Sequence, residues 1–436
     1  MTVPRTMPPT TTTTTTNATT PATGNTRAPA APGPLAGMRI LDFSRLLPGP
    51  WATQLLGALG ADVVKIEQPV IGDLSRHNHP RYVRDSVYFN TVNANKRSVA
   101  IDLSGGTAAE VVPSLVDWAD VLIESFRPGV AAKLGIDAAT ARARKPSLIH
   151  CAISGFGQTG PLSHIAGHDL VIQAATGVLG CHPPSEAPPD VPGFQSADYA
   201  GALMAVVAIQ AAWARRLQDG SGCTIDLGMY DALLSMCAMP LASAMSRATG
   251  GSGEPRAEVF GSNPRYSTYR TADGGAVAVS LLEARAWQSF CAAIGRPDLV
   301  RADETEADRL TGHGEHGVRY RAAIADYCSQ RTRDAVVDEM RRLGIAISAV
   351  LEPDEALALD HARERGTVAW IDHPVEGCIP QLRTPLHQAG LAAPMPRPAP
   401  GLGEHSVAFL LEAGLDPARV ARWLATGQVV QLDDDA

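Results

Sequence analysis

Two short stretches of this chain offer side chains that could act as an acid, a base or a nucleophile. The first is Gly167-His168-Asp169, and the second is GFQSADYAG, which contains Asp198. Residues 199–217 then have the length and apolar composition of a long helix, which places Asp198 at a helix N-terminus. The helix dipole and the unpaired N–H groups favour an anion there, so Asp198 is a candidate nucleophile or base. The alternative is that Asp198 only caps the helix, because Asp is a preferred capping residue.

Strand and helix signals alternate along the first half of the chain. Apolar runs predict strands at 38–44, 61–67, 98–103, 120–126 and 148–154, and helical spacing predicts helices near 51–60, 106–118 and 129–144. This alternation favours an α/β fold in which helices cover both faces of a parallel sheet. The turn after the first strand reads PGP in place of GxGxxG. Since proline has no amide N–H, a dinucleotide phosphate loop is not expected there.

The pattern changes after residue 240. Residues 250–264 are rich in Gly, Ser and Pro, which is typical of a linker or mobile loop. A tight turn at 271–275 (TADGG) predicts a hairpin, and helical spacing at 284–294, 317–330 and 333–343 with a strand at 344–350 predicts a small α+β domain. The expected organisation is a disordered Thr-rich tail at 1–33, a large domain at 34–240, a linker at 241–265, the small domain at 266–360 and a return segment at 361–436 that completes the large domain.

The composition narrows the function classes. The chain has 436 residues, of which 45% are hydrophobic and 19% charged, and its net charge of −8 gives no support to nucleic-acid binding. No run of about 18 apolar residues is free of polar breaks, so no membrane span is expected. The seven cysteines include no CxxC pair, which indicates neither a disulfide framework nor a zinc site and fits a reducing cytoplasm.

Six stretches in sequence order resemble the class III CoA-transferases, a family that includes formyl-CoA and carnitine CoA-transferases and the α-methylacyl-CoA racemases. They lie at 34–69, 93–103, 119–136, 154–179, 198–234 and 266–283, and the resemblance covers nearly everything after residue 34. It implies a Rossmann-like large domain made from both chain ends, a smaller α+β domain, and a homodimer of interlocked chains. Coenzyme A thioesters and carboxylic acids are the substrates it implies, with no permanently bound cofactor.

The resemblance also implies roles for three residues. Asp198 aligns with the nucleophile of the transferases, which carries CoA as an aspartyl thioester. Backbone N–H groups of the glycines near 250–262 are candidate oxyanion donors. In the racemase branch, His168 and Asp198 would be the two bases on opposite sides of the α-carbon, with Glu283 partnering His168.

The sequence leaves three functions open and favours the first. The stretch 77–98 and the run QAATG after residue 172 resemble the transferases, whereas His168 stands where many transferases have an aromatic residue. A CoA-transferase is therefore expected, with a 2-methylacyl-CoA racemase as the alternative. A non-catalytic CoA-binding protein is the third possibility, which the presence of Asp198 disfavours.

Binding of CoA requires cations for its phosphates. Lys133 matches a basic residue that the family places at the nucleotide, and Arg127, Lys96 and Arg97 are further candidates. Each of these four could equally be a solvated surface charge. Two family contacts are absent, because Gln68 replaces an Arg and Ser104 replaces a Lys.

Overall fold

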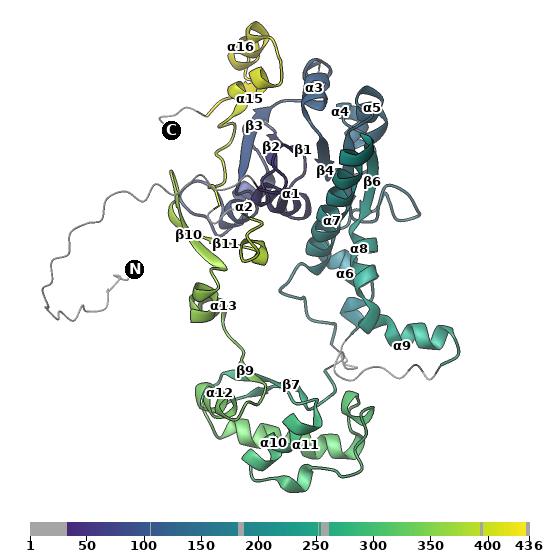
Figure 1. Ribbon diagram of the computed structural model, residues 1–436, viewed down its shortest axis with the longest axis vertical. Coiled ribbons are helices and arrows are strands. Elements are labelled where there is room, and N and C mark those ends of the chain that lie inside the picture. Colours follow the sequence, from purple (N-terminus) through teal and green to yellow (C-terminus); the bar gives the residue numbers. More distant parts are fainter. Residues whose placement is uncertain are drawn as a thin grey trace, which may run out of the picture. The chain divides into compact units, whose positions relative to one another are not determined.

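A mixed, mostly parallel sheet of seven strands organises the protein (Figure 1). The computed structural model describes residues 33–104, 106–181, 187–251, 253, 261–392 and 396–432. The strand order is β12-β3-β2-β1-β4-β5-β6. The strands are β1 Arg39–Asp42, β2 Asp62–Glu67, β3 Lys96–Ile101, β4 Val121–Glu124, β5 Ile149–Ser154, β6 Cys223–Gly228 and β12 Val429–Val430. The first five confirm the strands predicted from the apolar runs.

Helices cover both faces of this sheet, as predicted. One face packs against α1 (Pro48–Ala58), α7 (Ser196–Asp219) and α8 (Met229–Met236). The other face packs against α3 (Thr107–Trp118), α4 (Val130–Leu134), α5 (Ala138–Arg144), α15 (Ser406–Glu412) and α16 (Pro417–Ala425). The strands are short and apolar on both sides because both faces are buried.

Strand β12 departs from the predicted parallel sheet. It pairs antiparallel with β3, so that Val429 lies opposite Ile101, whereas the other five pairings in this sheet are parallel. The chain end therefore adds an antiparallel edge strand. A two-residue strand carries too little apolar pattern to be found by periodicity.

Helix α7 is long and apolar enough to cross a membrane by length and composition. Ala197, Ala200, Ala205 and Ile209 are nevertheless among the residues that bury one of its faces in the core, against α1 and the sheet. It is therefore a core helix of the α/β layer. Small residues on this face let the helix approach its neighbours closely, which explains its alanine-rich sequence.

Residues 261–349 contain a second, smaller sheet with its own core. Strands β7 (Tyr266–Arg270) and β8 (Ala276–Ser280) form the predicted hairpin, and β9 (Ile347–Ala349) pairs antiparallel with β8. Helices α10 (Ala284–Ala293), α11 (Gly314–Ser329) and α12 (Arg333–Arg342) supply the rest of that core. Helix α9 (Ala238–Ala248) occupies the first part of the segment expected to be a linker, and residues 252 and 254–260 of that segment lie outside the described residues, as does the tail up to residue 32.

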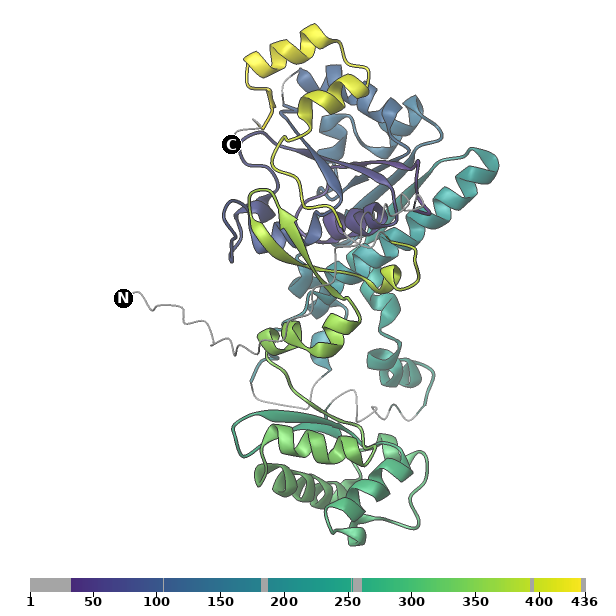
Figure 2. The same ribbon diagram turned by 60° about the vertical axis from the view of Figure 1, so that its left-hand side comes forward.

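The return segment begins with α13 (Pro353–Ala358) and α14 (Asp360–Glu364) and continues with an antiparallel hairpin, β10 (Val368–His373) and β11 (Gly377–Leu382). The hairpin lies beside α2 (Val87–Val92), where the Gln381 side chain donates to the Thr91 carbonyl at 2.9 Å (Figures 1 and 2). At its turn, the Glu376 carboxylate accepts the backbone N–H groups of Val83, Arg84 and Asp85. These contacts hold the loop that leads into α2.

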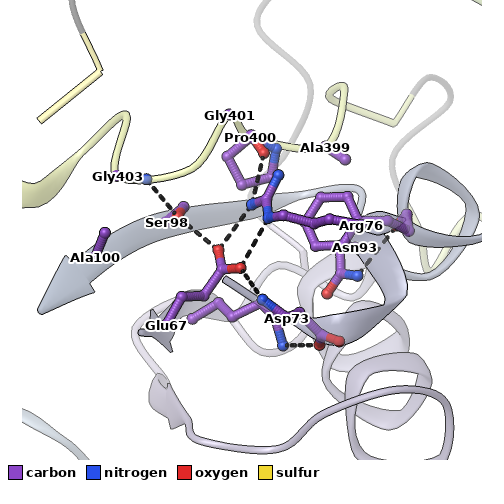
Figure 3. A network of polar contacts seen from close by, with 12 residues as sticks. Glu67, Asp73, Arg76, Asn93, Ser98, Ala100, Ala399, Pro400, Gly401 and Gly403 are labelled. Atoms are coloured by element: carbon purple, nitrogen blue, oxygen red, sulfur yellow. Dashed lines mark hydrogen bonds and ion pairs between the residues drawn. The ribbon is translucent and has the colours of Figure 1, made fainter. Parts of the chain in front are cut away.

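A buried polar network fixes the same loop from the other side (Figure 3). Arg76 is 2% exposed and forms a two-fold ion pair with Glu67 at the end of β2, while also contacting Asp85. Its guanidinium lies 3.6 Å from the Phe89 ring centroid and donates to the Pro400 carbonyl of the return segment. The network thereby joins β2, the loop before α2 and the C-terminal part of the chain.

Candidate functional site

The carboxyl edge of the sheet, between β1 and β4, is the position where an open α/β sheet binds ligands. From β1 the chain adds β2 and β3 on one side, and it then crosses to add β4, β5 and β6 on the other. The loops that follow β1 and β4 diverge at such a switch point and leave a crevice. Here the two loops remain in contact, because the Arg45 N–H donates to the Ser125 hydroxyl at 3.0 Å.

Three cations lie on these two loops and the helix that follows. Arg45 places its guanidinium 5.0 Å from the Phe126 ring centroid, and Arg127 and Lys133 are exposed on the turn before α4 and on α4 itself. Within the described chain, no side-chain ion pair occupies any of the three. Arg127 and Lys133 therefore remain candidates for the phosphates of CoA, and Arg45 is a further cation that the sequence reasoning missed.

Lys96 is not such a candidate, which corrects the expectation from sequence. It is 3% exposed, and its ammonium donates to the Asp42 carboxylate, the Pro50 carbonyl and the Asn93 side chain at 3.0, 2.9 and 2.7 Å. All three of its N–H groups are thus in use. Burial alone would raise the pKa of Asp42, but the Lys96 and Lys65 ammonium groups hold it well below its usual range. Lys96 anchors α1 to the sheet.

Arg97 is also engaged elsewhere. Its guanidinium forms ion pairs with Asp62 at 2.6 Å and with Glu412 at 2.6 Å, and it lies over the Phe409 ring. These contacts tie β3 to the start of β2 and to α15, so Arg97 supports the fold and has no free edge for a phosphate.

The Gly-His-Asp motif is held in place by a close approach of two backbones. A side chain on Gly155, at the turn after β5, would place its Cβ 3.2 Å from the Gly167 Cα. The same turn accepts a hydrogen bond at its Gly155 carbonyl from the Tyr230 N–H of α8. The absence of a side chain at Gly155 thus lets the two loops approach closely just before α6 (Asp169–Ala175).

Asp198 lies in the first turn of α7, as predicted, but it is the third residue of the helix and not its cap. Its carboxylate is half-buried, and no described residue donates a hydrogen bond to it. Burial, together with the nearby Asp169 carboxylate, raises the pKa of Asp198 to about 7. A half-buried carboxylate with a raised pKa and no hydrogen-bond donor among the described residues is a candidate functional group.

Aromatic side chains lie beside this carboxylate. Tyr199 packs edge-on against Trp51 of α1 at a ring-centroid distance of 4.8 Å and stacks on Phe194 at 5.0 Å. Tyr88 of α2 is close enough that burial and then the charge of Asp198 raise the pKa of its phenol. Because α7 runs toward the amino end of the parallel strand β6, its first turn lies at the same carboxyl edge as the loops after β1 and β4.

The two other predicted catalytic residues are less closely tied to this site. His168 immediately precedes α6 and is exposed, and it is linked to Asp198 only through its neighbour Asp169. Glu283 precedes α10 and is exposed. Among the described residues of this single chain, neither a hydrogen bond nor an ion pair joins Glu283 to His168. The glycine segment 250–262 is described only at residues 250, 251, 253, 261 and 262.

The chain belongs to CoA-transferase family III, whose family model matches residues 35–406. It is a class III CoA-transferase enzyme with the CaiB/BaiF fold, and members of the family use CoA thioesters as substrates. The match covers the six parallel strands β1 to β6, α7 and the hairpin of the return segment, whereas β12 lies beyond it.

Individual relatives show the same coverage. A succinate–glutarate CoA-transferase of Agrobacterium fabrum is 29% identical over 397 residues, which is 89% of this chain and 97% of the relative. A succinyl-CoA:mesaconate CoA-transferase of Haloarcula marismortui is 32% identical over 88% of this chain and 97% of the relative. A crystal structure of a CaiB/BaiF family protein from Brucella suis superposes with a TM-score of 0.75 at 29% identity, covering 88% of this chain and all of that chain.

Proposed function

We propose that this enzyme transfers CoA from an acyl-CoA donor to a carboxylic acid acceptor through a covalent intermediate on Asp198. The observation that carries the proposal is the half-buried Asp198 carboxylate at the carboxyl edge of the sheet, to which no described residue donates a hydrogen bond. A carboxylate whose pKa is near neutrality is more basic than an exposed one, and is therefore the stronger nucleophile when ionised.

The reaction can be written as four balanced acyl transfers. The Asp198 carboxylate attacks the thioester carbonyl of the donor, forming a mixed anhydride and releasing CoA thiolate. The thiolate then attacks the Asp198 carbonyl, which gives an aspartyl-CoA thioester and releases the donor acid. The acceptor carboxylate attacks this thioester, forming a second anhydride and releasing CoA thiolate. The thiolate finally attacks the acceptor's acyl carbonyl, which yields the new acyl-CoA and restores Asp198.

The amide groups at the start of α7 do not supply the oxyanion donors for these steps. The N–H groups of Ser196 and Tyr199 bond to the Phe194 and Gln195 carbonyls, and those of Ala197 and Asp198 bond to Asp169. Oxyanion stabilisation therefore has to come from another segment, and the glycines near 250–262 remain our candidates.

The phosphates of CoA would bind at the switch point of the sheet. Arg127 and Lys133 project from the segment after β4 without ion-pair partners among the described residues, and Arg45 adds a third cation after β1. Guanidinium and ammonium groups at the carboxyl edge of a parallel sheet suit a phosphorylated ligand.

The homodimer and a cytoplasmic location are part of the same proposal. Helix α7 exposes Leu203, Met204 and Val207, of which Val207 is 60% exposed. A second copy of the chain would cover this apolar face.

The proposal is tested by following isotope from a labelled acid into CoA ester. We would incubate the enzyme with succinyl-CoA and labelled glutarate or mesaconate, the acids named for its relatives. Asp198→Ala should abolish exchange, while Asp219→Asn, at the exposed far end of the same helix, should leave it unchanged. Borohydride reduction of the enzyme during turnover should label Asp198, since it reduces an aspartyl thioester to the alcohol. Exchange within tenfold of wild type in Asp198→Ala would refute the proposal.

Solvent deuterium separates the transferase from the racemase alternative. A transferase leaves the α-carbon of a 2-methylacyl-CoA unlabelled, and His168→Phe should retain measurable exchange of CoA between acids. Rapid deuterium incorporation by wild type that is lost in His168→Phe would establish the racemase instead.

A further inference from the structure

The N-terminus of α7 is capped by a residue from another helix. The Asp169 Oδ1 atom accepts the N–H groups of Ala197 at 2.7 Å and Asp198 at 3.3 Å, although Asp169 lies 29 residues earlier in the chain than Asp198. The residue in the usual capping position, Gln195, makes no side-chain bond to the helix. The free amides of the first turn are thus satisfied by a tertiary contact.

Asp169 is itself held firmly. Its other oxygen, Oδ2, accepts the Gln173 side-chain amide at 2.6 Å, and Gln173 is 2% exposed. The same amide group donates to the Phe194 carbonyl at 3.1 Å, in the segment that enters α7. Asp169 and Gln173 together join α6 to Phe194, which precedes α7, and to two residues in the first turn of α7.

This arrangement changes what the Asp198 carboxylate can do. An aspartate in the first turn of a helix is normally attracted to the free N–H groups and the positive end of the dipole. Here Asp169 already occupies those N–H groups, and its negative charge opposes a second carboxylate approaching them. The Asp198 carboxylate consequently has no intrahelical partner.

We propose that Asp169 is a positioning residue for the transfer reaction: by capping α7 in place of Asp198, it keeps the Asp198 carboxylate unbonded and directed to the substrate. This inference rests on the proposed role of Asp198 as the covalent nucleophile. It also explains why the first turn of α7 contains an aspartate, Asp198, that does not cap the helix.

The charges around Asp198 give the inference a second consequence. The titratable groups that face it are the Asp169 carboxylate from α6, the Tyr88 phenol from α2 and the Tyr199 phenol on α7 itself. Of these, the charge of Asp169 adds to burial in raising the pKa of Asp198. Removal of that charge should therefore move the pH dependence of catalysis toward lower pH.

The test compares Asp169→Asn and Asp169→Ala with wild type. Asn keeps an oxygen that can cap the helix but loses the charge, so the midpoint of the kcat–pH profile should move to lower pH. Ala releases the two N–H groups to Asp198, and kcat should fall about 10- to 100-fold, the usual effect of misplacing a reacting group by about 1 Å. The KM for acyl-CoA should remain within about threefold, and borohydride trapping on Asp198 should slow in parallel with kcat.

Asp416→Ala is the matched control. Asp416 caps α16 through the Arg419 N–H at 3.2 Å, so its loss measures the effect of removing an ordinary cap on stability alone. If both Asp169 variants retain wild-type kcat and pH midpoint while Asp198→Ala is inactive, the positioning role is refuted and the nucleophile stands. If Asp198→Ala is active, the proposed function fails whatever the Asp169 variants do. If Asp169→Ala does not fold, the pH midpoint of Asp169→Asn decides.

Discussion

Replacing Asp198 by Asn should make the folded enzyme more stable at pH 8 while abolishing its activity. The folded protein holds the pKa of Asp198 near 7, because of burial and then of Asp169, against an ordinary value near 3.8. Between those two values the folded chain binds a proton that the unfolded chain has lost, so the free energy of unfolding falls as the pH rises. Above pH 7 Asp198 is ionised in the folded protein as well, and the full destabilisation from holding that charge in a half-buried site is then present.

The size of this cost follows from the same two values. A difference of about three units between the two pKa values corresponds to roughly 4 kcal/mol in the free energy of unfolding, at 1.36 kcal/mol per unit. The positive end of the helix dipole offsets up to about 1 kcal/mol of this cost. Solvent screening of a half-buried group reduces the remaining cost further. We therefore expect Asp198→Asn to gain about 2 kcal/mol at pH 8, and about a third of that at pH 5.

Thermal unfolding at pH 5 and pH 8 measures this difference. A gain of about 2 kcal/mol should raise the Tm by roughly 2 °C in a chain of this length. Asp219→Asn provides the control, since Asp219 ends the same helix with an exposed carboxylate and should give no gain that grows with pH. Equal stabilisation at both pH values, or a loss at pH 8, would contradict the electrostatic argument.

Three further predictions follow from the described contacts. The rate of CoA exchange should fall about tenfold per pH unit below pH 7, because the proposed mechanism requires an ionised Asp198. A steady-state kcat that stays constant from pH 5 to 8 would argue against Asp198 as the nucleophile. Arg76→Met should cost about 3–5 kcal/mol in urea unfolding, because it leaves the buried Glu67 carboxylate without its cation; a loss below about 1 kcal/mol would show that the network is not tightly held. Arg127→Gln and Lys133→Gln should each raise the KM for acyl-CoA about 5- to 10-fold with little change in Tm. Lys96→Met should instead lower the Tm, because Lys96 is the buried partner of Asp42. The opposite pattern would restore Lys96 as a phosphate ligand.

Much of the sheet was predictable because its strands are buried on both faces and separated by helices with clear periodicity. Strands β1 to β5 and helices α1, α3 and α7 all follow from that pattern. The short elements did not follow from it. Helix α2 has six residues and strand β12 has two, so neither contains enough repeats of the apolar pattern to be distinguished from a loop.

The residues of the functional site were harder to predict from the sequence than the strands of the sheet. The position of Asp198 at the start of a helix could be predicted because it depends on local sequence. Lys96 and Arg97 could not be sorted from Arg127 and Lys133, because their partners, Asp42, Asp62 and Glu412, lie far away in the sequence. A basic residue looks the same in a sequence whether it anchors the core or faces a ligand.

The cap of α7 bears on the role of Asp198, which local sequence could not decide. From the sequence alone, Asp198 had two alternative roles, as a cap or as a nucleophile, and nothing local could separate them. The tertiary contact from Asp169 supplies the cap and so removes the structural reason for an aspartate at position 198. What remains is a carboxylate that is half-buried, repelled by its neighbour and unpaired among the described residues, an arrangement that lowers stability. Because such an arrangement has no benefit to the fold, its presence at the edge of the sheet where the cations Arg127 and Lys133 lie is best explained by the chemistry of acyl transfer.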